Sequence, residues 1–410
     1  MNVLVSKDRK LRKIKPNVHL KISLAIIYYM GTWPPKGKYR LVYITYTVCC
    51  FIFMLGIFLA TEIANLIISW GNLAKMIAGA TLLMTNCTHA CKVMIILCKQ
   101  KRIRALLDVT KSELFSRNNI KYEDVLGRYT WHGILHHAAY QSFGAVAVFC
   151  WGFSPIADLI AGRSRQLPME GWYPYNVTAT PAFEITSSHQ GIAIIIACFH
   201  NVAMDTLVTG LITVACCQFT LLSRDIVSIN SIKIEQSVIE SDEGTKIIRR
   251  NDDITYDKLK LCIKHSNMIF EFSNEIENIF GTVIFLQFLV NCIIICLIAF
   301  NITQMKVYIP SVLLGMVMYM CCMTYQIFIY CWHGNELHLH SINVVLAAFS
   351  SNWWHASSKF KKGLQIIMIR AQRPLELRAG SIMLLSLNTF VSCECPIPFS
   401  RSCKARRWNK

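Results

Sequence analysis

Residues 279–302 read IFGTVIFLQFLVNCIIICLIAFNI, 24 residues without a single Asp, Glu, Lys or Arg. A bilayer core about 30 Å thick is crossed by a helix of roughly 20 apolar residues, so this run is long enough to span a membrane. Comparable apolar runs occur at 41–69, 73–98, 133–160, 189–217 and 308–331, and a seventh, shorter one follows Pro374. The sequence therefore predicts an all-α membrane protein, a bundle of seven transmembrane helices of which the last is incomplete.

The composition of the whole chain agrees with this prediction. Of the 410 residues, 54% are hydrophobic and 16% are charged, and the mean hydropathy is +0.39. Soluble domains have about 25% charged residues, so this chain lacks the polar surface that a globule of its size needs. A net charge of +18 would suggest nucleic acid for a soluble protein, but here the expected partner is the lipid bilayer and no nucleic acid is expected.

Basic residues are distributed unequally between the two sides of the predicted bundle. Residues 1–40, 99–131 and 224–275 contain 26 Lys and Arg, whereas the alternate connections contain three. Because loops rich in Lys and Arg stay on the cytoplasmic side, the N-terminus is predicted to be cytosolic. The outside loop then contains the glycosylation sequon Asn176-Val177-Thr178. This orientation is opposite to that of a G-protein-coupled receptor, which argues against that class.

These features divide the chain into segments. We expect a cytosolic N-terminal segment, a six-helix bundle with one long outer and one long inner loop, cytosolic amphipathic helices that form an anchor domain, a partial pore helix and a basic tail. In that order the segments are 1–40, 41–331 (outer loop 161–188, inner loop 224–277), 332–373, 374–392 and 393–410.

Six ionisable residues lie within the predicted spans, where such groups often have functional roles. Four of them lie within a few turns of a span end, and we expect their side chains to reach the interface. The other two, His89 and Asp205, lie deeper and are candidates for more than a structural role. The four expected to reach the interface are Glu62, Lys75, Lys92 and Asp158.

No pattern typical of an enzyme is present. The sequence contains no Gly-rich phosphate loop and no nucleophile elbow, so we predict no catalytic residues and no cofactor. His132, His136 and His137 share a helix face, but no carboxylate or Cys accompanies them. The 18 cysteines lie mostly in apolar runs, so we predict neither a metal site nor a disulfide framework.

Several local motifs resemble those of insect odorant receptors. Met30-Gly31-Thr32-Trp33-Pro34-Pro35 is similar to the segment that precedes the first span of that family. The most specific stretch is 326–390, which includes Tyr330-Cys331-Trp332-His333-Gly334-Asn335-Glu336-Leu337 and Ser386-Leu387-Asn388-Thr389-Phe390. Two positions depart from the usual pattern, since His340 replaces Glu and Phe349 replaces Tyr.

The resemblance implies a function. Members of that family are inverted seven-helix proteins of the plasma membrane, found in the dendrites of olfactory sensory neurons. They bind small volatile odorants and assemble with a shared co-receptor into hetero-tetrameric, non-selective cation channels. Mapped onto this chain, the ligand pocket would include Leu83, Met84, Phe149, Trp151, Ile192, Ile196, Met316 and Tyr319, and the pore helix Leu384, Leu387 and Phe390.

Two other functions are kept as alternatives. The sister family of gustatory receptors has the same predicted topology, but its last helix usually carries Thr-Tyr, a short apolar run and Gln-Phe. Residues 386–390 of this chain fit the odorant pattern better. The other alternative is a membrane carrier that is not a channel. Reconstituted protein that shows substrate flux without current would favour it.

The C-terminal segment departs from the family pattern. Counted from Ala379 to Ser392, a helix would reach about 21 Å, less than the roughly 30 Å core. Pro396 and Pro398 oppose its continuation, and five basic residues follow. We therefore expect the 410-residue form, expressed with the co-receptor, to give no odorant-evoked current or a poorly gated leak; a normal ligand-dependent current would contradict this.

The predicted orientation is tested by labelling intact cells. An epitope tag at the N-terminus should stay inaccessible to antibody until the membrane is permeabilised, because 26 basic residues hold that side in the cytosol. Glycosidase treatment should shift the electrophoretic mobility of the protein, and Asn176→Gln should abolish the shift. A tag that antibody reaches on intact cells would overturn the assignment.

Overall fold

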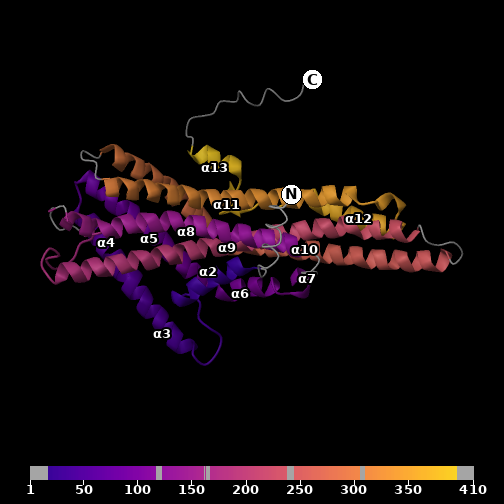
Figure 1. The fold of residues 1–410 in the computed structure, drawn as a ribbon, viewed down its shortest axis with the longest axis horizontal. Coiled ribbons are helices and arrows are strands. Elements are labelled where there is room, and N and C mark those ends of the chain that lie inside the picture. Colours follow the sequence, from indigo (N-terminus) through magenta and orange to yellow (C-terminus); the bar gives the residue numbers. More distant parts are fainter. Residues whose placement is uncertain are drawn as a thin grey trace, which may run out of the picture.

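The computed structural model describes residues 17–116, 122–160, 162, 167–237, 244–304 and 310–394. They form an elongated bundle of helices that run nearly along one axis (Figure 1). The all-α fold expected from the sequence is confirmed. The helices are α2 (Val18–Tyr29), α3 (Arg40–Phe51), the π-helix η1 (Ile52–Gly56), α4 (Ile57–Ile68), α5 (Leu73–Cys98), α6 (Gln100–Val109), α7 (Glu113–Ser116), α8 (Glu123–Ile160), α9 (Ala182–Ser237), α10 (Gly244–Gln304), α11 (Pro310–Ser350), the 3-10 helix η2 (Trp353–His355), α12 (Ser358–Ala371) and α13 (Leu387–Glu394).

Each of the six long apolar runs lies on helix. Among the described residues, α5, α9, α10 and α11 are long and apolar enough to cross a membrane. The third predicted span lies on the 38-residue α8. The first predicted span, 41–69, is a continuous run of α3, η1 and α4, but α3 leans away from the bundle (Figure 1). Residues of this arm are therefore largely exposed, as expected for a surface that faces lipid.

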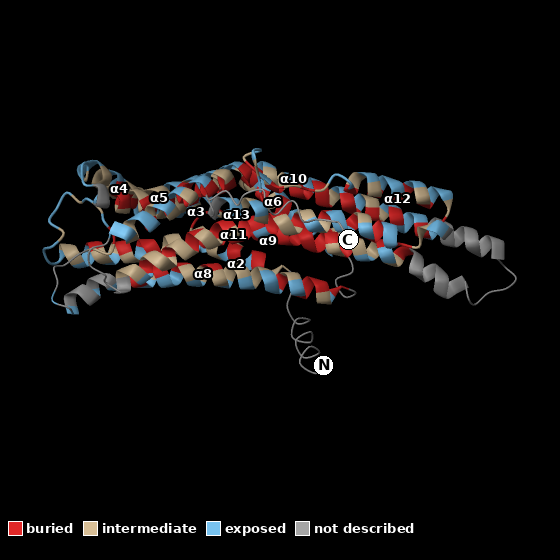
Figure 2. Ribbon diagram, turned by 90° about the horizontal axis from the view of Figure 1, so that it is seen from above, coloured by how far each residue is buried: buried red, intermediate tan, exposed pale blue. Residues whose placement is uncertain are grey.

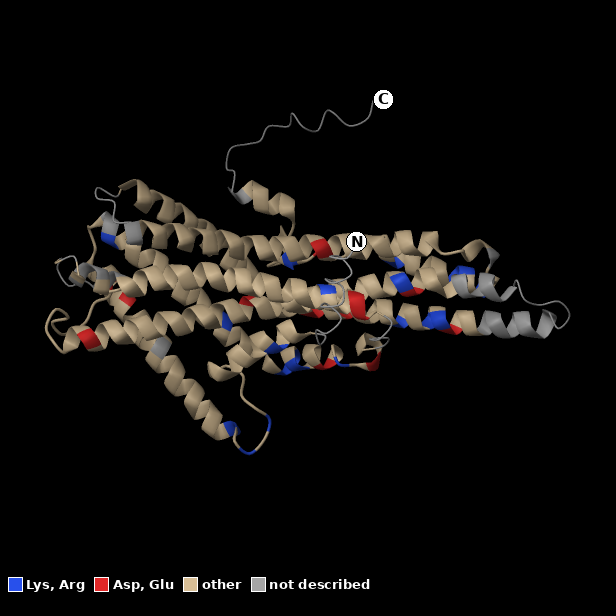
Figure 3. Cartoon of the chain, viewed as in Figure 1, with Lys and Arg blue, Asp and Glu red and all other residues tan. Residues whose placement is uncertain are grey.

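Three helices are much longer than a bilayer is thick. Helix α10 has 61 residues, about 90 Å at 1.5 Å per residue, which is about three times the hydrocarbon core. The charged residues gather mainly on the half of the molecule that contains α6, α12 and the start of α10 (Figure 3). There α12 packs on α10 and α11. The assignment of 332–373 to an anchor domain remains a prediction. That this half is cytosolic remains a prediction.

The C-terminal part of the chain differs from the expected helix over 379–392. Strands β1 (Arg378–Ala379) and β2 (Met383–Leu384) form a two-stranded antiparallel sheet, and α13 begins only at Leu387. Gly380 and Ser381 have φ of 60° and 63°, which a right-handed helix cannot contain. Leu384 is therefore on a strand, whereas Leu387 and Phe390 are on α13. Residues 395–410, which make up most of the predicted tail, lie outside the described residues.

The centre of the bundle is a buried ion pair. Lys92 Nζ on α5 lies 2.6 Å from Asp205 Oδ1 on α9, and the two side chains are only 5% and 1% exposed. Asp205 also accepts hydrogen bonds from Tyr140 on α8 (3.1 Å) and from Tyr330 (2.8 Å) and Gln326 on α11. The expectation that Lys92 reaches the interface is wrong, because its charge is neutralised inside the bundle.

Glu62 is a second correction of the same kind. Its side chain is buried, and its two carboxylate oxygens accept hydrogen bonds from Asn86 Nδ2 at 2.8 and 3.0 Å. The side chains of Lys92 and Glu62 are therefore both held by neighbouring helices, although their distance along the chain from a span end had suggested otherwise. Figure 2 shows that buried residues follow the length of α9, which packs against α2, α8, α10 and α11.

Replacing Asp205 by Asn should strongly destabilise the bundle. The substitution leaves the Lys92 ammonium buried without a counter-charge, a loss of about 3–5 kcal/mol for pairs of this kind. Thermal unfolding of the purified protein in detergent measures this loss of stability. Asp108→Asn breaks an exposed pair with Lys111 and should change stability by no more than about 0.5 kcal/mol. Equal stability of the two variants would show that the buried pair does not hold the helices together.

Candidate ligand-binding cavity

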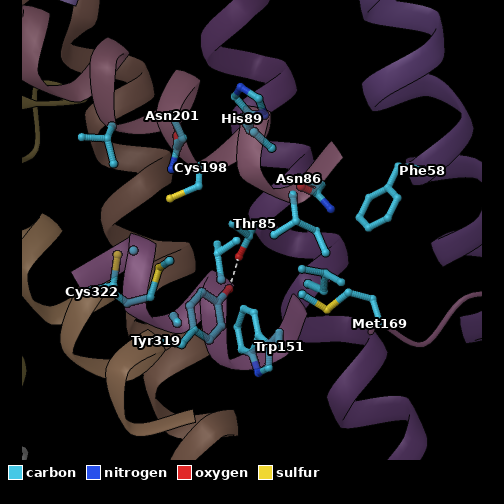
Figure 4. Close-up of a pocket in the computed structure, with 18 of the residues that line it drawn as sticks. Phe58, Thr85, Asn86, His89, Trp151, Met169, Cys198, Asn201, Tyr319 and Cys322 are labelled. Atoms are coloured by element: carbon cyan, nitrogen blue, oxygen red, sulfur yellow. Dashed lines mark hydrogen bonds between the residues drawn. The ribbon is translucent and has the colours of Figure 1, made fainter. Parts of the chain in front are cut away.

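An apolar cavity lies between α4, α5, α8, α9 and α11 and is bordered by Met169 of the loop that precedes α9 (Figure 4). Its volume is about 80 Å³, which is room for roughly six water-sized spheres. Five helices and one loop supply the wall. The lining residues are Phe58, Leu82, Thr85, Asn86, His89, Tyr140, Gly144, Ala147, Val148, Trp151, Met169, Ile194, Ala197, Cys198, Asn201, Val202, Tyr319, Cys322 and Met323.

Two aromatic rings form one side of the cavity. Trp151 of α8 and Tyr319 of α11 meet edge to face, with ring centroids 5.0 Å apart and planes at 68°. The Tyr319 hydroxyl lies 2.5 Å from Thr85 Oγ1 of α5, and Thr85 in turn donates to the Thr81 carbonyl at 3.0 Å. Edge-to-face contact and a tethered hydroxyl hold both rings in place, so the shape of this wall is well defined.

A glycine sets the width of the cavity between α8 and α9. A Cβ atom at Gly144 would lie 2.7 Å from Cys198 Sγ and 3.8 Å from Cys322 Sγ. That first distance is far below a normal contact, so a larger residue would push α8 away from α9. Gly144 therefore permits the close approach that keeps the cavity small.

The outer loop covers the cavity. The backbone N–H of Met169 donates to Gln190 Oε1 at 3.1 Å, and Gln190 Nε2 donates back to the Met169 carbonyl at 3.2 Å. Gln190 also donates to the Tyr173 hydroxyl at 3.1 Å. These bonds tie the loop to α9 and place the Met169 side chain over the cavity. In the same loop Asn176 is exposed, as the predicted glycosylation requires.

The floor of the cavity is connected to the ion pair. Tyr140 donates to Asp205, and Asn201 Oδ1 accepts from Lys92 Nζ at 2.8 Å. Tyr140 and Asn201 line the cavity. Lys92 and Asp205 contact these two residues but do not line the cavity themselves. The described lining contains no Asp, Glu, Lys or Arg, so the cavity offers no fixed charge to a ligand.

The predicted pocket residues fall into three groups. Trp151 and Tyr319 line the cavity. Met84 and Met316 pack in the apolar cluster around Tyr319 without lining the cavity, and Leu83 also lies outside the wall. The remaining three are Phe149 and Ile192, which are 63% and 55% exposed, and Ile196, which lines a different cavity between α3, α5 and α9.

The differences between the predicted residues and the cavity lining have one physical cause. A transmembrane helix is apolar on all sides, so hydropathy does not reveal which face meets its neighbours. Val148 and Ile194 line the cavity, only one or two positions from Phe149 and Ile192, which do not. Met169 was not among the predicted residues because it belongs to the loop at 161–188, outside the six predicted spans.

The fold is that of a multi-pass helical membrane protein with an apolar cavity inside its bundle. The model of the seven-transmembrane odorant receptor family matches residues 72–394, and the chain belongs to this family. Odorant receptor Or1 of Anopheles gambiae is 23% identical over 381 residues, which cover 90% of this chain and 89% of the relative. Putative odorant receptor 92a of Drosophila melanogaster is 30% identical over 131 residues, covering 32% of this chain and 31% of the relative.

The fold is also that of a solved insect receptor. The olfactory receptor OR5 of Machilis hrabei, solved in complex with eugenol, superimposes with a TM-score of 0.76 at 17% identity. The superposition covers 92% of this chain and 96% of that receptor. A second structure of the same receptor superimposes with a TM-score of 0.75 at the same identity. At this identity the likeness establishes the fold.

Truncating either ring should change which odorants act on the protein. Trp151→Ala and Tyr319→Ala each remove a ring that contacts the cavity, whereas Phe149→Ala removes a ring from the exposed surface of the same helix α8. The panel of volatiles that stabilise the purified protein against thermal unfolding should change for the first two variants only. An unchanged panel for both cavity variants would exclude this cavity as the odorant site.

Proposed function

We propose that this chain is the odorant-binding subunit of a ligand-gated cation channel and that the cavity beside Trp151 and Tyr319 is its odorant site. The observation that carries the proposal is an apolar cavity without fixed charge inside an odorant-receptor fold. The same fold in Machilis hrabei OR5 was solved with eugenol, a small neutral aromatic molecule. At about 80 Å³ the cavity is smaller than such a molecule, so its wall must move outward when an odorant of that size binds.

The ligand class follows from the wall chemistry. Most polar groups at the wall are already engaged: Tyr319 with Thr85, Tyr140 with Asp205 and Asn86 with Glu62. His89 Nδ1 is buried without a hydrogen-bond partner among the described residues, and it carries no fixed charge that could pair with a charged ligand. A ligand with a net charge would lose its hydration and find no counter-charge, which costs several kcal/mol. Small, neutral, mostly apolar volatiles avoid this penalty, and shape then determines which of them fit.

The expected affinity is modest. A volatile of about 10 heavy atoms that gains about 0.4 kcal/mol per atom binds with about 4 kcal/mol. That corresponds to a dissociation constant on the millimolar scale. Weak binding of this kind fits a receptor that responds to airborne ligands and releases them quickly.

Assembly and conduction belong to the same proposal. The co-receptor would join this chain in a hetero-tetramer in the plasma membrane of olfactory neurons, through the helical layer of α10, α11 and α12. The exposed apolar side chains Phe349, Ile366 and Ile369 give that layer a surface suited to a partner subunit. Helix α13, with Leu387 and Phe390, would face the pore. Phe390 packs on Phe328 of α11 with centroids 5.5 Å apart, which would link the pore to the odorant-binding bundle.

Neutral volatiles should stabilise the purified protein and their carboxylates should not. The test compares octanol with octanoate and eugenol with homovanillate in thermal unfolding. A ligand at ten times its dissociation constant adds about 1.4 kcal/mol to the unfolding free energy. Stabilisation by the carboxylates but not by the neutral partners would contradict the proposed ligand class.

Two neighbouring variants separate the cavity from the surface of the same helix. Val148→Trp fills the cavity and should abolish stabilisation by every volatile that binds the parent protein. Phe149→Trp makes a similar change on the exposed side of α8 and should leave stabilisation intact. Equal loss in both variants would point to a general effect on α8 rather than to the cavity.

A further inference from the structure

A second cavity lies between the α3–η1 arm and the bundle, on the other side of His89 from the odorant cavity. Its volume is about 420 Å³, about five times the 80 Å³ of the odorant cavity. Residues of α3, η1, α5, α9 and the turn after α2 line it. They are Met30, Thr32, Tyr46, Thr47, Cys49, Cys50, Phe51, Phe53, Leu55, His89, Val93, Ile196, Ala197 and His200.

The cavity lies at the depth of the hydrocarbon layer. His89 and His200 are about four to five helical turns from the starts of α5 and α9, the ends predicted to lie outside. Cys49 and Phe53, which also line the cavity, are exposed on the arm, so the space communicates with the surface of the bundle there. In a protein that crosses a membrane, this surface meets lipid chains rather than water.

Most polar groups of the wall already have partners inside the protein; the exception among the described lining atoms is His89 Nδ1, which is buried and exposes almost no surface to an occupant. Thr47 donates to the Gly31 and Tyr43 carbonyls at 2.5 and 2.9 Å, and Tyr46 donates to the Tyr29 carbonyl at 2.7 Å. The two ring nitrogens of His200 lie 2.8 Å from Thr32 Oγ1 and 3.1 Å from His89 Nε2. An occupant therefore needs no hydrogen-bonding group, which favours a plain hydrocarbon.

The volume of this cavity and its contact with the lipid phase indicate which kind of hydrocarbon it binds. In this measure a water molecule needs about 10–15 Å³, so the space holds roughly thirty water-sized spheres, far more than one small volatile fills. A methylene group is about as large as a water molecule, so a long acyl chain fits. Left empty, the wall would lose its dispersion contacts, and a chain that enters from the bilayer restores them without leaving an apolar medium.

We infer that this second cavity binds the acyl chain of a membrane phospholipid. This cavity is adjacent to the proposed odorant site, because His89 and Ala197 line both cavities and form their common wall. A chain that presses on this wall changes the shape of the odorant cavity. This coupling rests on the proposed odorant function; the binding of the chain does not.

Photolabelling tests the inference directly. The full-length receptor is placed in phosphatidylcholine nanodiscs that contain a phosphatidylcholine with a diazirine in the middle of one acyl chain, and labelled residues are identified by mass spectrometry. Val93 and His200 are buried at 1% and 5% exposure, so label on them requires a chain inside the cavity. Label confined to exposed residues of α3 and α5 would overturn the inference.

A matched pair of substitutions identifies the cavity as the source of the label. Cys50→Trp fills the cavity and should lower the label on Val93 and His200 by at least about fivefold, because two groups cannot share one close-packed volume. Cys91→Trp makes the same change on an exposed position of α5 outside either lining and should change that label less than about twofold. Cys50→Leu serves as a milder filler if Cys50→Trp does not fold. Equal labelling of filled and control variants would overturn the inference.

A competition arm separates a lipid from a volatile as the occupant. An excess of octanol should leave the label on Val93 and His200 unchanged if the cavity holds a phospholipid chain. Removal of the label by octanol would reassign the cavity to volatiles. Neither readout depends on an odorant response, so failure of the lipid site and failure of the odorant site are distinguishable. Where odorant responses are measured, Cys50→Trp should also shift the half-maximal odorant concentration, and Cys91→Trp should not.

Discussion

The buried contact between Lys92 and Asp205 is the constraint around which the bundle is organised. A single charge at this depth would be very unfavourable, so the pair requires that α5 and α9 stay together. The remaining oxygen positions of Asp205 are used by side chains from α8 and α11. Four helices therefore converge on one carboxylate. Hydrophobic sorting does not hold helices together within a lipid phase, and directional polar contacts of this kind specify which helices are neighbours.

The polar network continues toward the C-terminal elements. Gln326, which donates to Asp205, also accepts hydrogen bonds from Gln287 and Asn291 of α10 at 3.1 and 2.7 Å. Helix α11 then carries Phe328, which contacts Phe390 of α13. The structure thus joins the floor of the odorant cavity, the ion pair and α13 by contiguous contacts. Such a chain of contacts is a physical route by which the cavity and α13 can be coupled. Double-mutant cycles measure the coupling free energy.

Hydropathy was sufficient to locate the helices but not to orient them. A run such as 279–302 is recognisable in any context, because only a helix satisfies its backbone in lipid. The rotation of that helix is decided by packing, which left Phe149 on the surface and Val148 in the cavity. Trp151 and Tyr319 were among the residues mapped from the family resemblance, and both line the cavity. The turn at Gly380 and Ser381 was missed because the surrounding residues are as apolar as those of a helix.

The separation between the ion pair and the cavity wall has an evolutionary consequence. Lys92 and Asp205 lie behind the lining, while the side chains that shape the cavity come from five helices and a loop. Substitutions at Val148, Ile194 or Met169 can therefore alter the space available to a ligand without disturbing the contact that holds the helices in register. Selection for a new odour can act on one set of positions while selection for folding acts on another. Chains that share 17% of their residues can thus keep one architecture and still differ in what they detect.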